Sequence, residues 1–423
     1  MGLINKKKDF TPFDMKRKPI KQPLFLLALL WGASRAATAG MKVTKIRMEG
    51  LKPPYLVYST HQGFSDYFIV PRMLFPHNCN YVSDMEGFAA FGNGPYRAGG
   101  CIGKRRYVPD VAVMSNIRYA LQKLKQGVVI FPESRHCDVG ITSQMPKNLG
   151  RLAKLMDVPL VVIYSHGAYL ANPFWDEGHT RKLKMESTAE LLYTVEELSK
   201  ASPEEIQRRV EEKLTYDEYA WQKEKGIKIK DENRAVGLHL PLYRCKACKV
   251  KGKMHSGGTD VWCGACGQRW TLTADGELRE EGTGIISDVP SWYRWERNIV
   301  REAVEKDTYT GIDVPVFVEA LPNEKGFISL GSGRLVHNRE GFLLKLDREE
   351  NQARDHFPLF LPNRLLESVQ TEYNYRERGK CIVLSTRNCC YYVYSKAEEF
   401  CVTELEFAVE ELSRLPEAKS RAK

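Results

Sequence analysis

The spacing of four cysteines constrains the fold of this chain more than any other feature of its sequence. Two Cys-x-x-Cys pairs are separated by 14 residues, and their members are Cys245, Cys248, Cys263 and Cys266. Four thiolates at this spacing match the tetrahedral geometry of a structural Zn²⁺ site. A segment of roughly 30 residues needs such a metal to fold. We therefore predict a Cys₄ zinc ribbon over residues 240–280, with His255 as a loop residue and not a ligand.

Two roles remain open for the predicted ribbon. The first pair is surrounded by Lys246, Lys249, Lys251 and Lys253, so the ribbon could contact nucleic acid or protein. It could equally be a stabilising spacer. The chain has 11 Cys, an odd number without the closely spaced framework of a small secreted domain. This favours a reducing, cytoplasmic environment.

Residues 43–170 alternate between apolar strands and amphipathic helices. Strands are expected near 55–59, 80–82, 128–131 and 158–164, with helical spacing between them. A further helix is predicted to begin at Ser202, because Pro203 and Glu205 complete an N-terminal capping pattern. The alternation predicts an α/β domain with a mostly parallel sheet, which we assign to residues 41–235.

Residues 1–40 join a basic segment to the apolar run Pro23–Ala33. The run is about half of the ~20 residues that span a bilayer. We interpret it as an interfacial segment on the cytoplasmic face of a membrane, peripheral or monotopic, with lysines on anionic head groups. The formal net charge of +10 agrees with anionic partners. Two alternatives are a signal peptide cleaved within 36–39 and a helix packed on its own domain.

The pattern changes again after the ribbon. Several short strands follow residue 314, and a closing helix carries Leu405, Val409 and Leu412 on one face. We predict a β-rich α+β module over 285–423. The order of its elements resembles a pleckstrin-homology or GRAM-type barrel, for which lipid docking or packing against the first domain is expected.

A histidine and a carboxylate follow the first predicted strand, in the segment HQGFSD. His61 is suited to take a proton from a hydroxyl, because imidazole titrates near neutral pH. Asp66 would fix its tautomer and stabilise the imidazolium. Five residues on a regular helix would separate the two side chains by about 140°. A strand-to-helix turn relaxes that constraint, so we expect the pair to meet there.

Two further segments carry charged residues at strand ends. Glu133 and Arg135 follow the strand VVIF, at the edge where open α/β sheets bind ligands. Arg135 could hold a phosphate, since a guanidinium matches two phosphate oxygens, or form a surface pair with Glu133. A glycine-containing segment ends in Lys104, Arg105 and Arg106, which could bind phosphate or be a solvated charge run.

Together these segments resemble the glycerolipid acyltransferase family, the group that contains the 1-acylglycerol-3-phosphate acyltransferases. His61–Asp66 resembles its HxxxxD motif, and Gly100–Arg106 resembles its second block. Phe131–Arg135 resembles the third block, FPEGTR, and Val158–Ile163 resembles the fourth. The four blocks occur in the family order over roughly residues 43–180.

The resemblance implies a reaction and a set of roles. His61 would deprotonate an acceptor hydroxyl with Asp66 holding its ring, and the oxygen would attack the thioester of acyl-CoA or acyl-carrier protein. No acyl-enzyme is expected. The expected acceptor is 1-acylglycerol-3-phosphate, in phospholipid biosynthesis, with glycerol-3-phosphate or another lysolipid as alternatives. Substrate-binding roles would fall to Glu133, Arg135, Arg106, Lys104 and Arg105.

The sequence departs from the family pattern in two places. Phe131–Arg135 is one residue shorter than FPEGTR, which brings Arg135 closer to Glu133. In the second block, Lys104 and Arg105 stand where the family has apolar and acidic residues, so the phosphate ligand among the three cations stays open. A rival class, a nucleic-acid-binding zinc-ribbon protein, would explain the ribbon and the charge. It leaves HQGFSD and the apolar N-terminal run unexplained, so nucleic acid is not the partner that we expect.

Overall fold

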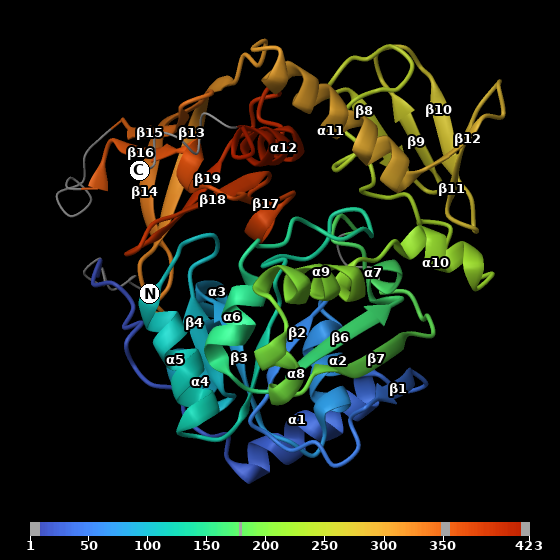
Figure 1. Cartoon of the computed structure of the whole chain (residues 1–423). Coiled ribbons are helices and arrows are strands. Elements are labelled where there is room, and N and C mark those ends of the chain that lie inside the picture. Colours follow the sequence, from blue (N-terminus) through green and yellow to red (C-terminus); the bar gives the residue numbers. More distant parts are fainter. Residues whose placement is uncertain (1–8, 177–179, 348–355, 416–423) are drawn as a thin grey trace, which may run out of the picture.

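A computed structural model describes residues 9–176, 180–347 and 356–415 of the 423-residue chain. Three sheets organise it, and Figure 1 shows the N-terminal sheet below the other two. The N-terminal sheet has the order β1-β7-β6-β2-β5-β3-β4. Its strands are β1 Lys42–Ile46, β2 Leu56–Ser59, β3 Cys79–Asp84, β4 Cys101–Lys104, β5 Gly127–Ile130, β6 Leu160–His166 and β7 Glu186–Tyr193.

This first sheet is mixed and mostly parallel, which confirms the predicted α/β architecture. Strands β6, β2, β5, β3 and β4 run parallel, β7 is antiparallel to β6, and β1 is parallel to β7. Strands β2 and β5 are buried along their whole length, as expected of central parallel strands with both faces covered. In a parallel sheet the carboxyl ends of neighbouring strands share one edge, where ligands bind.

Successive residues of the central strands point into two different cores. Leu56 and Tyr58 pack with helices α5 (Val111–Gln122), α6 (Leu149–Met156) and α9 (Pro203–Leu214). Tyr55 and Val57 pack on the opposite face against α2 (Asp66–Leu74). The predicted start of α9 is present, since Ser202 Oγ accepts a hydrogen bond from the N–H of Glu205 at 3.1 Å. The remaining helices of this unit are α1 Leu24–Ala37, α3 Met85–Phe91, α4 Asn93–Ala98, α7 Ala168–Ala171, α8 Val195–Lys200 and α10 Glu218–Glu224.

Helix α1 packs along α2 at the bottom of Figure 1. Trp31 lies against Phe75, and Arg72 donates a hydrogen bond to Thr38 Oγ1 at 2.7 Å. The outer face of α1 stays open to solvent, with Leu24 78% and Phe25 65% exposed. Within the described ranges, no helix combines the length and apolar character needed to cross a bilayer.

The cysteine-containing segment forms a five-stranded antiparallel sheet in the order β12-β11-β10-β9-β8. Its strands are β8 Met254–Gly257, β9 Asp260–Cys263, β10 Arg269–Leu272, β11 Glu277–Glu280 and β12 Ile286–Asp288. Strand β12 thus extends this sheet into the range expected for the C-terminal module. Helix α11 (Val289–Glu305) follows, and its Trp292 meets Trp270 edge-on, with ring centroids 4.7 Å apart.

The C-terminal sheet is antiparallel in the order β16-β15-β14-β13-β19-β18-β17, and α12 closes it. Its elements are β13 Ile312–Leu321, β14 Ile328–His337, β15 Gly341–Leu346, β16 Leu359–Pro362, β17 Gln370–Glu372, β18 Cys381–Ser385, β19 Cys390–Tyr394 and α12 Val402–Leu412. One buried apolar cluster runs from Val139 and Tyr169 through Trp270 to Phe407. The three units therefore share a continuous core.

Candidate active site

The predicted histidine–carboxylate pair meets at the carboxyl end of β2. His61 follows this strand, and Asp66 opens α2. His61 Nδ1 lies 3.1 Å from Asp66 Oδ2, which also accepts hydrogen bonds from the backbone N–H groups of Gln62 (2.7 Å) and Gly63 (3.1 Å). The turn thus folds around one carboxylate oxygen. We assign the ring proton to Nδ1, which leaves the lone pair of the imidazole on Nε2.

The environment of the pair suits a neutral imidazole base. Burial lowers the pKa of His61 to about 3, and the positive charge of Arg106 acts in the same direction. Burial raises the pKa of Asp66 to about 7, while the backbone N–H groups of Gly63 and Gln62 lower it. The ring of His61 stacks on Phe131 with centroids 4.3 Å apart. His61 is therefore held in place and unprotonated at neutral pH.

His61 and Asp66 line a cavity of about 1110 Å³, large enough for a lipid-sized ligand. Its wall includes apolar side chains, among them Leu26, Leu29 and Leu30 of α1 with Phe64, Phe68 and Phe91. It also includes polar side chains, among them Asp84, Glu86, Lys104, Arg106, Gln370, Glu372, Tyr375 and Arg376. The C-terminal sheet and its loops thus supply part of the wall.

Of the three cations in the second block, Lys104 and Arg106 point into the cavity and Arg105 does not. Lys104 and Arg106 line the cavity; Lys104 Nζ lies 3.5 Å from Ser134 Oγ, and Arg106 pairs with Asp84. Among the described residues, no carboxylate pairs with Lys104. Arg105 turns away and donates hydrogen bonds to backbone carbonyls of the C-terminal unit: Arg387 (2.8 Å), Pro322 (3.1 Å) and Asn388 (3.1 Å).

Glu133 and Arg135 follow β5 but do not line the cavity. Glu133 accepts hydrogen bonds from the N–H of His61 (3.0 Å), the N–H of Ser143 (2.8 Å) and the hydroxyl of Tyr216 (3.0 Å). Its carboxylate therefore fixes the backbone of the base. The guanidinium of Arg135 binds Glu406 of α12 through both terminal nitrogens and lies 3.0 Å from Asp138.

Several residues of the cavity wall were not anticipated from the sequence. His136 lies edge-on to His61, with ring centroids 4.4 Å apart. Its position directly after Arg135 was the only available signal. Three carboxylates also line the cavity. Asp84 is the last residue of β3, Glu86 follows it shortly after, and Glu372 is the last residue of β17. Nothing in their local sequence distinguishes them from other surface carboxylates.

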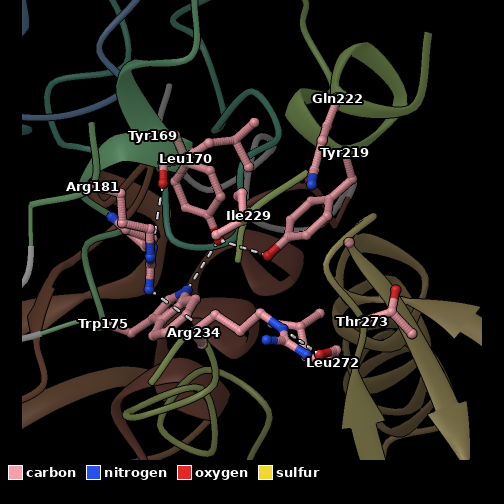
Figure 2. A pocket seen from close by; sticks show the side chains of 12 residues that line it. Tyr169, Leu170, Trp175, Arg181, Tyr219, Gln222, Ile229, Arg234, Leu272 and Thr273 are labelled. Atoms are coloured by element: carbon pink, nitrogen blue, oxygen red, sulfur yellow. Dashed lines mark hydrogen bonds between the residues drawn. The ribbon is translucent and has the colours of Figure 1, made fainter. Parts of the chain in front are cut away.

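A second cavity is too small to hold a substrate. It has a volume of about 20 Å³ and lies between the N-terminal unit and the cysteine-containing sheet, as Figure 2 shows. Tyr169 OH accepts a hydrogen bond from Trp175 Nε1 (3.0 Å), and Arg234 Nε donates to the carbonyl of Leu272 (2.6 Å). This space fits about one water molecule, so the larger cavity is the candidate active site.

The four cysteines converge as the sequence predicts. Their Sγ atoms all lie within 4.8 Å of one another, with 3.8 Å between Cys245 and Cys266 and 3.7 Å between Cys248 and Cys263. Ligands about 2.3 Å from a tetrahedral zinc ion stand about 3.8 Å apart. The residues thus fit a metal ion, and Zn²⁺ is the ion that we propose for a Cys₄ set.

The lysines around the first pair contact the neighbouring unit. Lys251 pairs with Glu404 (2.9 Å) and Lys253 with Glu398 (2.8 Å). Lys246 and Lys249 lie over the rings of Trp292 and Trp295 of α11, at 5.4 and 4.7 Å from the centroids. These contacts favour the stabilising role of the ribbon over nucleic-acid binding.

We expect the purified protein to carry one zinc ion per chain, measurable by elemental analysis. Cys245→Ser should remove it and lower the thermal unfolding temperature, because the ribbon shares its core with α11 and the C-terminal sheet. Cys79→Ala, outside the cluster, should leave the zinc content unchanged. A protein with the four cysteines intact but without stoichiometric metal would contradict the assignment.

Part of the N-terminal unit matches a known family model. Residues 41–166 match the family model described as Acyltransferase. Among solved structures, the 1-acyl-sn-glycerophosphate (LPA) acyltransferase PlsC from Thermotoga maritima is similar at 17% sequence identity and a TM-score of 0.37. That match covers 44% of this chain and 76% of the other. No curated protein matches the chain.

Proposed function

We propose, from the Acyltransferase match and the cavity around His61, that the protein transfers an acyl group from acyl-CoA or acyl-carrier protein to a hydroxyl of 1-acylglycerol-3-phosphate. One observation carries the proposal. A neutral histidine, oriented by a carboxylate, faces a cavity whose wall includes apolar side chains as well as Lys104 and Arg106. Such a wall can contact both an acyl chain and a phosphate.

His61 acts as the general base in this mechanism. Its Nε2 takes the acceptor hydroxyl proton as the oxygen attacks the thioester carbonyl carbon. Asp66, bonded to Nδ1, stabilises the imidazolium that forms. The tetrahedral intermediate then collapses, the carbon–sulfur bond breaks, and the imidazolium returns the proton to the leaving thiolate. No protein nucleophile takes part.

We assign the acceptor phosphate to Lys104 and Arg106, because both side chains reach the cavity and Nη1 of Arg106 has no hydrogen-bond partner among the described residues, although its Nη2 pairs with Asp84. Glu133, Arg135 and Arg105 act as positioning residues, since their polar groups are already bonded to protein partners. We therefore no longer propose that Glu133, Arg135 and Arg105 contact the substrate directly. The C-terminal unit supplies Gln370 and Glu372 to the cavity wall and so helps to shape the cavity.

The exposed face of α1 supports peripheral binding to a membrane. Leu29 is 66% exposed and also lines the cavity, so a lipid entering from a bilayer would pass along this helix. We propose that α1 lies in the interface on the cytoplasmic face, with Leu26, Leu29 and Leu30 in the cavity wall. For the C-terminal unit, seven antiparallel strands closed by α12 support the pleckstrin-homology or GRAM-type interpretation.

The test is an acyl-transfer assay with purified protein, palmitoyl-CoA or palmitoyl-acyl-carrier protein, and three acceptors: 1-acylglycerol-3-phosphate, glycerol-3-phosphate and a neutral lysolipid. We expect product with 1-acylglycerol-3-phosphate. Lys104→Ala should raise the KM for this acceptor and leave the KM for the donor unchanged. Product with glycerol-3-phosphate alone would shift the assignment to that acceptor, and product with none would overturn the proposal.

The rate should depend on pH through the His61–Asp66 pair. Asp66 must be ionised to stabilise the imidazolium, and burial raises its pKa to about 7. As the pH falls through this value the carboxylate is protonated, so kcat/KM should fall with it, with an apparent pKa that belongs to the pair. Asp66→Asn should abolish the rising limb. A flat profile between pH 6 and 8 would contradict this role.

A further inference from the structure

The mechanism above leaves one polar side chain beside the base without a role. His136 follows Arg135 and lines the same cavity as His61. The two rings meet at 76°, with centroids 4.4 Å apart. Phe174 and Tyr67 hold the ring of His136 from other sides, at centroid distances of 6.1 and 6.5 Å. In the described part of the chain, neither ring nitrogen of His136 has a hydrogen-bond partner.

His136 is a neutral hydrogen-bond donor. Burial lowers its pKa to about 3, with a further contribution from His61. A neutral imidazole carries one N–H, and in a closed site it can polarise a carbonyl without giving up its proton. A donor placed where charge develops is worth more in such a site than in water.

The reaction requires such a donor close to His61. Attack on the thioester moves the electron pair of the carbonyl onto its oxygen, which becomes an oxyanion. Because the attacking oxygen is held by His61, this oxyanion must form next to that ring. A donor about 2.7–3.1 Å from the oxyanion stabilises the transition state.

Resting on the proposed function, we propose that His136 donates a hydrogen bond to the thioester carbonyl oxygen as the oxyanion forms. The bond forms without proton transfer, and it weakens again when the intermediate collapses and the thiolate leaves. Two other donors are less suited. Lys104 is assigned to the acceptor phosphate, and the ring of Tyr67 is farther from His61, at 6.0 Å.

The test compares His136→Phe, which keeps a ring, with His136→Gln, which keeps an N–H donor. We expect His136→Phe to lower kcat by ~10²–10³-fold with little change in the KM of either substrate. His136→Gln should recover most of this loss, to within roughly tenfold of the wild type. His77→Phe, a matched substitution at a half-exposed histidine that does not line the cavity, should leave kcat unchanged.

A second measurement separates catalysis from packing. Binding of palmitoyl-CoA labelled with carbon-13 at the thioester carbonyl, without acceptor, should give a downfield signal in the wild type relative to His136→Phe. The fall in kcat/KM as the pH drops through about 7 should be unchanged in His136→Phe and His136→Gln, because His136 does not titrate in that range. Thermal unfolding of each variant serves as the control for folding.

The outcomes distinguish this inference from the proposed function. Wild-type turnover together with equal kcat in His136→Phe would overturn the role of His136 and leave the acyltransferase assignment standing. Equal losses in His136→Phe and His136→Gln, with no carbonyl shift, would show that the ring only packs. Failure of the wild type with every acceptor would overturn both.

Discussion

Replacing His61 by alanine should lower kcat/KM for acyl transfer by ~10²–10⁴-fold, the range that a positioned general base contributes. The imidazole is neutral and bonded to the buried carboxylate of Asp66, which leaves its Nε2 lone pair to take a proton in the cavity. Without it, the hydroxyl must be deprotonated by water. The measurement is steady-state kinetics with palmitoyl-CoA and 1-acylglycerol-3-phosphate.

The fold should tolerate this substitution. The backbone N–H groups of Gln62 and Gly63 still bind Asp66 when the ring is removed. Asp66→Asn provides a comparison, since it keeps the imidazole but removes the charge that stabilises the imidazolium and weakens the control of its tautomer. It should therefore retain more activity than His61→Ala. Equal turnover of His61→Ala and wild type, with product confirmed, would exclude His61 as the base.

The second large effect concerns stability. Arg135→Ala should lower the free energy of unfolding by about 3–5 kcal/mol, because it leaves carboxylates buried without their cation. Arg135 is 5% exposed, and it binds Glu406 and Asp138, which are 1% and 3% exposed. Tyr293 and Thr371 add hydrogen bonds to the same carboxylates. The measurement is urea unfolding followed by tryptophan fluorescence.

Two variants sharpen this test. Arg208→Ala removes an exposed ion pair with Glu212 on α9 and should change stability by less than ~1 kcal/mol. The double substitution Arg135→Met with Glu406→Leu removes one of the two unpaired carboxylates and leaves Asp138 without its cation, so its stability should lie between those of Arg135→Ala and the wild type. If Arg135→Ala unfolds at the wild-type urea concentration but has a raised KM for the acceptor, Arg135 binds substrate directly.

The sequence was informative where function depends on residues close together in the chain. The spacing of the four cysteines predicted that they would converge, and the position of His61 and Asp66 at a strand-to-helix turn predicted that these two would meet. The parallel strands followed from runs such as Val128–Phe131, whose composition reflects burial on both faces.

Contacts between residues far apart in the chain could not be predicted from local spacing. Arg135 meets Glu406, a residue 271 positions away, and Arg105 meets carbonyls more than 200 positions away. The shortened third block signalled that Arg135 departs from the family pattern, but no local pattern names a partner in another unit. His136 was missed for a related reason, since a lone histidine gains meaning only from the ring beside it.

Two distant parts of the chain contribute to the wall of the cavity. The proposed base and its carboxylate belong to residues 61–66, whereas Phe327, Glu372 and Tyr375 line the same cavity from the C-terminal unit, encoded some 300 residues later. Under the proposed function, substitutions in that unit would change the wall that an acceptor meets while His61 and Asp66 stay in place. New acceptors would then arise without a change in the proposed reaction.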